Sequence, residues 1–165
     1  MGGAIAQQFV LDYPKRCNCL VLASTYTFNF MTFGEKVLGS LLPFLVRIFG
    51  LRRFAKLVTT QGTKQLSKER ADWLSGLIAG QDMQLMLPAL REAVIEFDSR
   101  RRLAEIKCPT LIVVGSLDHG DVRQAKMMHD GITGSQLTIM GNADHALIWA
   151  HTDEFMHIVE EFLKV

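Results

Sequence analysis

The sequence has little excess charge, no long apolar run and no signal-like start, and each absence makes a class of function unlikely. Lysine and arginine total 18 against 17 aspartates and glutamates, a net charge of +1, so no global field attracts nucleic acid or an anionic membrane. The most apolar stretch, residues 37–51, is broken by glycine, proline and arginine and is shorter than the roughly 20 residues of a membrane span. The first ten residues lack the basic start and long apolar core of a signal peptide. We therefore expect neither nucleic acid nor a membrane span.

Cysteine is also scarce. Cys17, Cys19 and Cys108 are an odd number at spacings that match neither a C-x-x-C pair nor a zinc site. Reduced, buried thiols explain them better, and this predicts a cytoplasmic protein. No pair of histidines has a strong ligand spacing with nearby acids. We expect no metal and no cofactor.

The residues that are present indicate a folded α/β protein. Hydrophobic residues make up 48% of the 165 positions and charged residues 21%, as in a globular chain of about one domain. Apolar runs rich in branched residues predict strands at residues 17–23 and 110–115, the first suited to a buried parallel strand, and a further strand is predicted at residues 136–140. Helical spacing of apolar residues predicts helices at residues 4–12, 122–131 and 153–163. Strand and helix units in series imply parallel strands with right-handed crossovers.

A helical block interrupts this α/β pattern. Residues 32–102 show no strand-like alternation, and glycines mark the expected ends of about four helices. Ser67 and Asp82 are expected to cap two of them. The apolar residues of this block either pack helix on helix or line an apolar pocket; they include Phe44, Ile48, Phe49, Met83, Met86 and Leu87.

Two polar residues follow consecutive predicted strands. Asp118 comes after the strand at 110–115, and His145 comes 27 residues later, after the strand at 136–140. The carboxyl ends of parallel strands meet at one edge of a sheet, so the two loops should lie side by side. An aspartate that fixes one tautomer of a histidine is what a nucleophilic serine needs in order to lose its proton. The pair therefore predicts the acid and base of a hydrolytic site.

The opening Met1-Gly2-Gly3-Ala4 matches the residues that commonly follow the serine of a G-x-S-x-G turn. With this opening, the Tyr13-Pro14 helix end, the CNCLVLAS strand, the helical block and the phrase LAEIKCPTLIVVGSLD, the chain resembles the C-terminal two-thirds or so of an α/β-hydrolase fold protein. The resemblance implies a partial fold, with about three parallel strands, a core at 1–31 and 103–165, and a cap at 32–102.

The resemblance also implies roles for particular residues. Asp118 matches the triad acid, His145 the triad base, and the Met1 backbone amide one oxyanion donor. Gly2 and Gly3 are expected to allow a tight turn and close packing of helix on strand. The family's first five strands, its second oxyanion donor and its nucleophile have no counterpart in the sequence.

Three hypotheses follow. The first is a hydrolase of small apolar esters or lactones that works by acyl transfer, with the serine supplied upstream of Met1, in another chain or not at all, which makes activity of this chain alone doubtful. Ser24 as a replacement nucleophile and His119 as a replacement base are weaker alternatives.

The second hypothesis is a non-catalytic assembly module that forms a homo-oligomer, or recruits a partner chain, through the exposed edge of the strand at 17–23. The third is that Met1 is an internal residue of a longer product. The substrate is not indicated.

Overall fold

The structure is a computed structural model, which describes residues 1–29, 37, 39–62 and 64–164. It divides the chain into two compact units, here named the core unit (Met1–Thr27 with Asp98–Val165) and the insertion (Phe28–Phe97). The predicted first residue of the cap, residue 32, lies outside the described residues. The division found in the structure begins and ends a few residues earlier than the predicted one.

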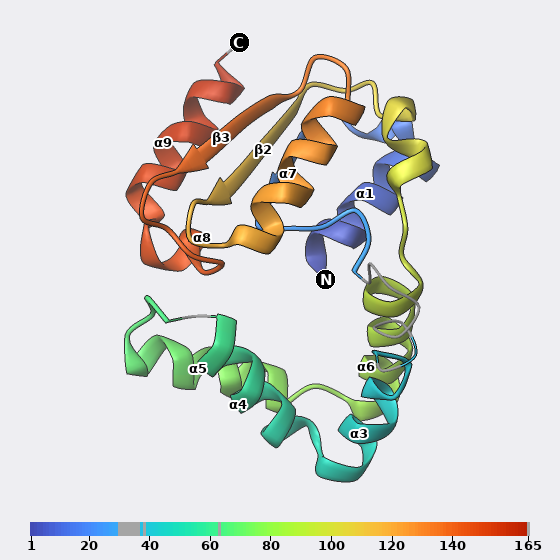
Figure 1. Cartoon of the computed structure of the whole chain (residues 1–165), viewed down its shortest axis with the longest axis vertical. Helices are drawn as coiled ribbons and strands as arrows, with labels where there is room; N and C mark the ends of the chain where they lie inside the picture. Colours follow the sequence, from blue (N-terminus) through green and yellow to red (C-terminus); the bar gives the residue numbers. More distant parts are fainter. Residues whose placement is uncertain (30–36, 38, 63, 165) are drawn as a thin grey trace. The chain divides into compact units, whose positions relative to one another are not determined.

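A three-stranded parallel sheet forms the centre of the core unit (Figure 1). Its order is β1-β2-β3, with β1 at Leu20–Ala23, β2 at Thr110–Gly115 and β3 at Gln136–Met140. Every residue of β2 is buried, as expected for a central strand. The predicted three parallel strands of a partial fold are confirmed.

Strand β1 is shorter than the predicted strand at 17–23, and Pro109 gives the physical reason. The register pairs Leu20 with Thr110, and the Leu20 amide donates to the Pro109 carbonyl at 2.9 Å. Proline has no N–H, so it cannot return a hydrogen bond that would carry the ladder toward Cys19. The pairing therefore begins only at Leu20.

Helices cover both faces of the sheet. Helices α1 (Gly2–Asp12) and α7 (His119–Gly131) pack on one face, where the 3₁₀ segment at Arg100–Glu105 also contributes Leu103. The short α8 (Leu147–Ala150) and α9 (Thr152–Leu163) pack on the other. A short 3₁₀ turn, Pro14–Arg16, links α1 to the segment before β1. The core therefore has the layers of an α/β domain, with its strand ends free to carry a site.

The insertion is helical wherever it forms regular structure in its described part, and it has a small core of its own. Its helices are α3 (Leu42–Phe49), α4 (Leu51–Gly62), α5 (Lys68–Ala79) and α6 (Met83–Leu90), followed by a π-helical segment at Arg91–Glu96. The predicted caps are present: Ser67 Oγ accepts from the Arg70 amide at 3.3 Å, and Asp82 Oδ1 accepts from the Gln84 amide at 2.8 Å. Gly76, one of the glycines expected to mark a helix end, instead lies inside α5, so the prediction is wrong at this position.

The apolar residues of the insertion fall into two groups. Met83, Met86 and Leu87 pack against its core of Val46, Leu51 and Leu90. By contrast, Phe44, Ile48 and Phe49 on α3 are exposed. Helix packing thus explains the first group, and the second provides apolar surface.

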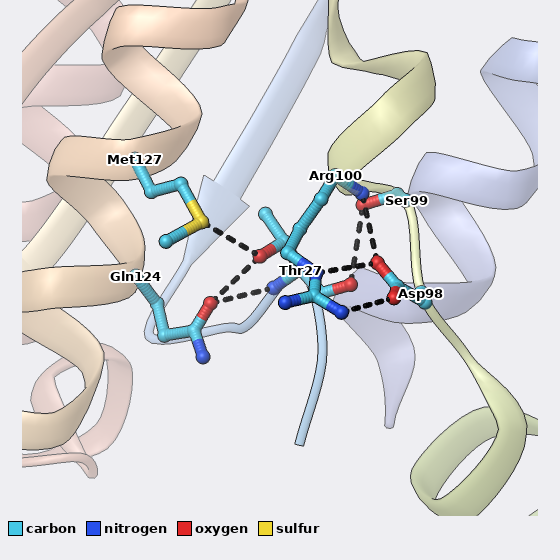
Figure 2. Close-up of polar contacts among 6 residues, drawn as sticks. All are labelled: Thr27, Asp98, Ser99, Arg100, Gln124 and Met127. Carbon is cyan, nitrogen blue, oxygen red and sulfur yellow. Dashed lines mark hydrogen bonds and ion pairs between the residues drawn. The ribbon is translucent and has the colours of Figure 1, made fainter. Parts of the chain in front are cut away.

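The two points where the insertion joins the core unit are tied together (Figure 2). The Ser99 amide donates to the Thr27 carbonyl at 2.9 Å. The Thr27 amide and hydroxyl both donate to Gln124 Oε1 of α7, at 3.1 and 2.7 Å, and Ser99 Oγ donates to Gln7 Oε1 at 2.7 Å. These polar side chains are buried and satisfied, so they fix the junction to the core.

No helix in the described part of the chain is long and apolar enough to cross a membrane. The cytoplasmic location stays a prediction.

Candidate active site

The two side chains predicted to work together meet at the carboxyl edge of the sheet. His145 Nδ1 lies 2.8 Å from Asp118 Oδ2. An ionised carboxylate can only accept, so Nδ1 is the donor and carries the proton. This leaves Nε2 as the nitrogen that can take up a proton when the ring is neutral. The geometry is that of an acid–base pair, and its catalytic role stays a prediction.

Asp118 is held by the start of the helix that follows it. It is the N-cap of α7, and its Oδ1 accepts from the Asp121 amide at 3.4 Å. Helix α7 therefore begins at His119, three residues before the predicted start at Val122, because the cap fixes the first turn ahead of the apolar pattern. One carboxylate thus caps a helix and accepts a hydrogen bond from His145 Nδ1.

The loops that carry Asp118 and His145 are joined by backbone hydrogen bonds. The Leu117 amide donates to the Ala143 carbonyl at 2.9 Å, and the Ser116 amide donates to the Met140 carbonyl at 2.9 Å. The Asn142 amide donates to Ser116 Oγ at 3.0 Å. These bonds set the spacing of acid and base.

Gly115, the last residue of β2, makes this approach possible. A Cβ on Gly115 would overlap the carbonyl group of Ala143 and lie 2.7 Å from the carbonyl oxygen of Asp144. Both obstacles are backbone atoms, which cannot rotate away as a side chain can. The site therefore requires glycine here for close approach, not for its φ angle.

A second carboxylate, not anticipated from the sequence, also reaches His145. Asp121 Oδ2 lies 3.1 Å from the same Nδ1 that contacts Asp118. The side chains of Asp118 and Asp121 are 19% and 16% exposed, whereas that of His145 is 53% exposed. One imidazole edge thus faces two largely buried acids, and the rest of the ring is open to solvent.

The two acids favour the charged form of the histidine. Hydrogen bonding to Asp118 first, and then to Asp121, raises the pKa of His145 from its ordinary 6.5 to about 10, against the opposing effect of burial. Burial, the largest single effect, raises the pKa of the Asp118 carboxyl, but the hydrogen bond and charge of His145 and the hydrogen bonds from Asp121 together outweigh it, and the net pKa is lower than usual. At neutral pH the pair is therefore an imidazolium and a carboxylate.

Met1 and Tyr26 lie within electrostatic reach of Asp121. Burial lowers the pKa of the Met1 amino group, and the charge of Asp121 opposes this change. Burial raises the pKa of the Tyr26 phenol to about 12, and Asp121 adds to that rise. Asp121 thus acts electrostatically on Met1, the residue predicted to supply an oxyanion donor, and also contacts His145. Tyr26 carries no motif that would mark it in the sequence.

Gly3 explains how the start of α1 packs so closely beside β1. A Cβ on Gly3 would overlap the side chain of Thr25, whereas a Cβ on Gly2 would meet no atom within 4 Å. The predicted need for glycine in close packing is therefore confirmed at Gly3 and is wrong at Gly2.

The two replacement residues considered from the sequence lie apart from this pairing. Ser24 follows β1 with φ of 39°, in the left-handed region that a residue with a Cβ rarely adopts. Its Oγ is buried and has no hydrogen-bond partner within the described part of the chain, so no base contacts it there. His119 is exposed at the first position of α7. Neither residue shares the hydrogen bond between Asp118 and His145.

The donor atoms of Asp118, Asp121 and His145 lie within 4.8 Å of one another, close enough for a cation site. However, the atom they share is a protonated Nδ1, which has no lone pair to offer a metal. The two carboxylates hold the proton on His145 Nδ1. This arrangement suits proton transfer at the other ring nitrogen, Nε2.

Comparison with known proteins supports the fold. No protein-family model matches the chain. The 2-hydroxy-6-oxononadienedioate/2-hydroxy-6-oxononatrienedioate hydrolase of Klebsiella pneumoniae is 30% identical over 99% of this chain and 59% of its own length. Proline iminopeptidase of Saccharolobus solfataricus is 35% identical over 41% of this chain and 22% of its own length. The chain thus spans well under two-thirds of these relatives.

Solved structures agree with the sequence relatives. MenH from S. aureus superposes with a TM-score of 0.85 at 26% identity, covering 98% of this chain and 64% of that one. The enol-lactonase from Burkholderia xenovorans LB400 gives a TM-score of 0.83 at 19% identity, over 100% and 63% of the two chains, which is a likeness of fold. With its three parallel strands and its hydrolase relatives, the chain belongs to the α/β-hydrolase fold family.

Proposed function

We propose that this chain carries the acid and base of a serine hydrolase that cleaves esters, lactones or related carbonyl compounds. The observation that supports this most directly is the 2.8 Å contact between His145 Nδ1 and Asp118 Oδ2 at the carboxyl edge of an α/β-hydrolase sheet. Asp118 orients the imidazole, and Nε2 of His145 is the base. The nucleophile is a serine at the position before Met1, which the 165-residue sequence does not include.

The proposed reaction is acyl transfer. His145 Nε2 takes the serine proton while the serine oxygen bonds to the substrate carbonyl carbon, and the carbonyl oxygen becomes an oxyanion. The Met1 backbone amide, placed at the start of α1, donates to that oxyanion when a residue precedes it. The oxyanion collapses and breaks the bond to the leaving alkoxide, which takes the proton from the imidazolium and leaves an acyl-serine. In a second cycle His145 Nε2 takes a proton from water, whose oxygen displaces the serine and releases the acid. Asp118 stabilises the imidazolium in both.

The substrate class rests on relatives and on exposed apolar surface. One relative is named for hydrolysis of 2-hydroxy-6-oxononadienedioate and a structural neighbour is an enol-lactonase. The insertion exposes Phe44, Ile48 and Phe49 on α3, which gives a ligand an apolar surface to contact. The name of the structural neighbour supports a lactone or ester, whereas the relative's substrate is a dicarboxylate by its name. The apolar character of the proposed substrate therefore rests on the exposed surface of the insertion.

The proposal is tested by adding the missing nucleophile. A form extended upstream through Gly-x-Ser is expected to hydrolyse short p-nitrophenyl esters, and the 165-residue chain is expected to give only background release. The same extension with alanine in place of the serine is the control, and it should also give background. An extended form that folds but shows no hydrolysis above this control would contradict the proposal.

A second candidate function is assembly through the β1 side of the sheet. Strand β1 is one of the two edge strands in the order β1-β2-β3. Ile5 and Phe9 of α1 and its C-cap residue Tyr13 follow one another at intervals of four residues and are 56%, 39% and 52% exposed. An edge strand beside an exposed apolar stripe favours pairing with a second copy or a partner chain.

Light scattering over a range of concentrations tests this second candidate. The 165-residue chain is expected to self-associate, and Ile5→Lys is expected to weaken association because it puts a charge in the stripe. Leu163→Lys is the matched control, since Leu163 is equally exposed, at 57%, but lies at the end of α9. A monomer at high concentration, or equal effects of the two substitutions, would count against assembly at this surface.

A further inference from the structure

Asp121 lies one helical turn beyond Asp118, and this spacing aims both carboxylates at one atom. Asp118 is the N-cap of α7, and Asp121 is the third residue of that helix. Their oxygens lie 2.8 and 3.1 Å from His145 Nδ1. The contact with Asp118 has hydrogen-bond geometry, and the contact with Asp121 is an ionic contact only 0.3 Å longer. The proton on Nδ1 therefore faces both carboxylates.

The carboxylate of Asp121 has His145 as its oppositely charged neighbour. Its Oδ2 is fully enclosed and has no hydrogen bond of good angle within the described part of the chain, only the 3.1 Å ionic contact. A carboxylate taken out of water needs an opposite charge close by. The groups that act on Asp121 are the imidazole of His145, the Met1 amino group and the Tyr26 phenol, and those that act on His145 are Asp118 and Asp121.

We propose that Asp121 is a second positioning residue for His145, sharing the Nδ1 proton with Asp118. This inference rests on the role of His145 as base in the proposed function. Either carboxylate alone can hold the ring with Nε2 outward, so the site has two acids where a triad needs one. The second acid adds negative charge beside the imidazolium and moves proton release from Nε2 to alkaline pH.

The sign of the effect follows from the charges. Asp118 and Asp121 both favour the protonated ring, and together with burial they leave its pKa at about 10. General-base catalysis needs the neutral ring, so the rate of a serine-containing form rises as pH increases toward that value. Removing one carboxylate makes the neutral ring available at lower pH.

The test is an NMR titration of the His145 imidazole in the 165-residue chain, with wild type, Asp118→Asn, Asp121→Asn and the double variant. Each single variant is expected to lower the pKa by roughly 1 to 2 units, and the double variant is expected to return it to about 6.5. Asparagine at 118 still caps α7. Asp130→Asn makes the same change at an exposed position of the same helix and should leave the pKa unchanged.

Two results would overturn the proposal. One is a His145 pKa in Asp121→Asn that stays within about 0.3 units of wild type while Asp118→Asn lowers it by the amount given above. The other needs no substitution, and so holds even if a variant fails to fold: titration of His145 in wild type near its ordinary value of 6.5. The titration does not involve hydrolysis. An inactive extended form would therefore refute the proposed function and leave this result standing.

Discussion

Replacing His145 by glutamine is expected to lower kcat of the serine-containing form by roughly 10⁴- to 10⁶-fold, the loss typical of a missing triad base. Glutamine keeps a polar group near Asp118 but cannot take the serine proton at Nε2. KM should change little, because the substrate does not need the base in order to bind. Initial rates with a short p-nitrophenyl ester, measured at several substrate concentrations, check both values.

His157→Gln provides the control for this experiment. His157 lies on α9, its side chain is 69% exposed, and its ionic contact is with Glu161 at 3.4 Å. The substitution removes a histidine from the same chain without touching the sheet edge, so activity should stay close to wild type. If His145→Gln retained more than about a tenth of kcat, in place of the loss expected for a triad base, His145 would not be the base.

Gly115→Ala is expected to lower the unfolding free energy more than a methyl group added anywhere else in the core unit. The added Cβ overlaps the Ala143 carbonyl group and approaches the Asp144 carbonyl oxygen. The loop that carries His145 must move to relieve the clash. We expect a loss of about 2 to 3 kcal/mol of unfolding free energy, the upper part of the usual cost of overpacking. Urea unfolding measures it.

The same substitution should lower the activity of the serine-containing form by about 100-fold, because a displacement of the base by about 1 Å misaligns proton transfer. Gly120→Ala is the matched control. Gly120 lies in the first turn of α7, and a Cβ there would meet no atom within 4 Å. That variant should be as stable as wild type or slightly more stable. If the two variants had equal stability and equal activity, the close approach of the two loops at Gly115 would not be needed to position His145.

The pairing of Asp118 with His145 could be predicted because it depends on topology. Parallel strands deliver their carboxyl ends to one edge, and both residues follow a strand whose bounds are visible as an apolar run. Asp121 could not be found in this way, since an acid in the first turn of a helix is ordinarily explained by the helix dipole. The sequence does show that Asp121 lies three residues after Asp118. That spacing indicates a shared partner only once the path of the loop carrying His145 is known.

The fold shows the same contrast between pattern and context. The strand at 110–115 matches the structure because its own apolar run fixes it, and the strand at 136–140 also matches in its bounds although it includes the polar residues Gln136 and Thr138. The extent of β1 depends on a residue far away in sequence, Pro109, whose missing N–H stops the ladder. The strain at Ser24 is also invisible in the sequence, because serine gives no sign of a positive φ.

The hydrogen bond from the Ser99 amide to the Thr27 carbonyl makes the insertion a closed loop on the core unit. The entropy of closing a loop grows only slowly, by about 0.6 kcal/mol for each doubling of its length. Residues can therefore be gained, lost or exchanged between Phe28 and Phe97 at small thermodynamic cost, while Asp118 and His145 keep their spacing. The insertion can therefore diverge in length and sequence without disturbing the proposed acid–base pair at the sheet edge.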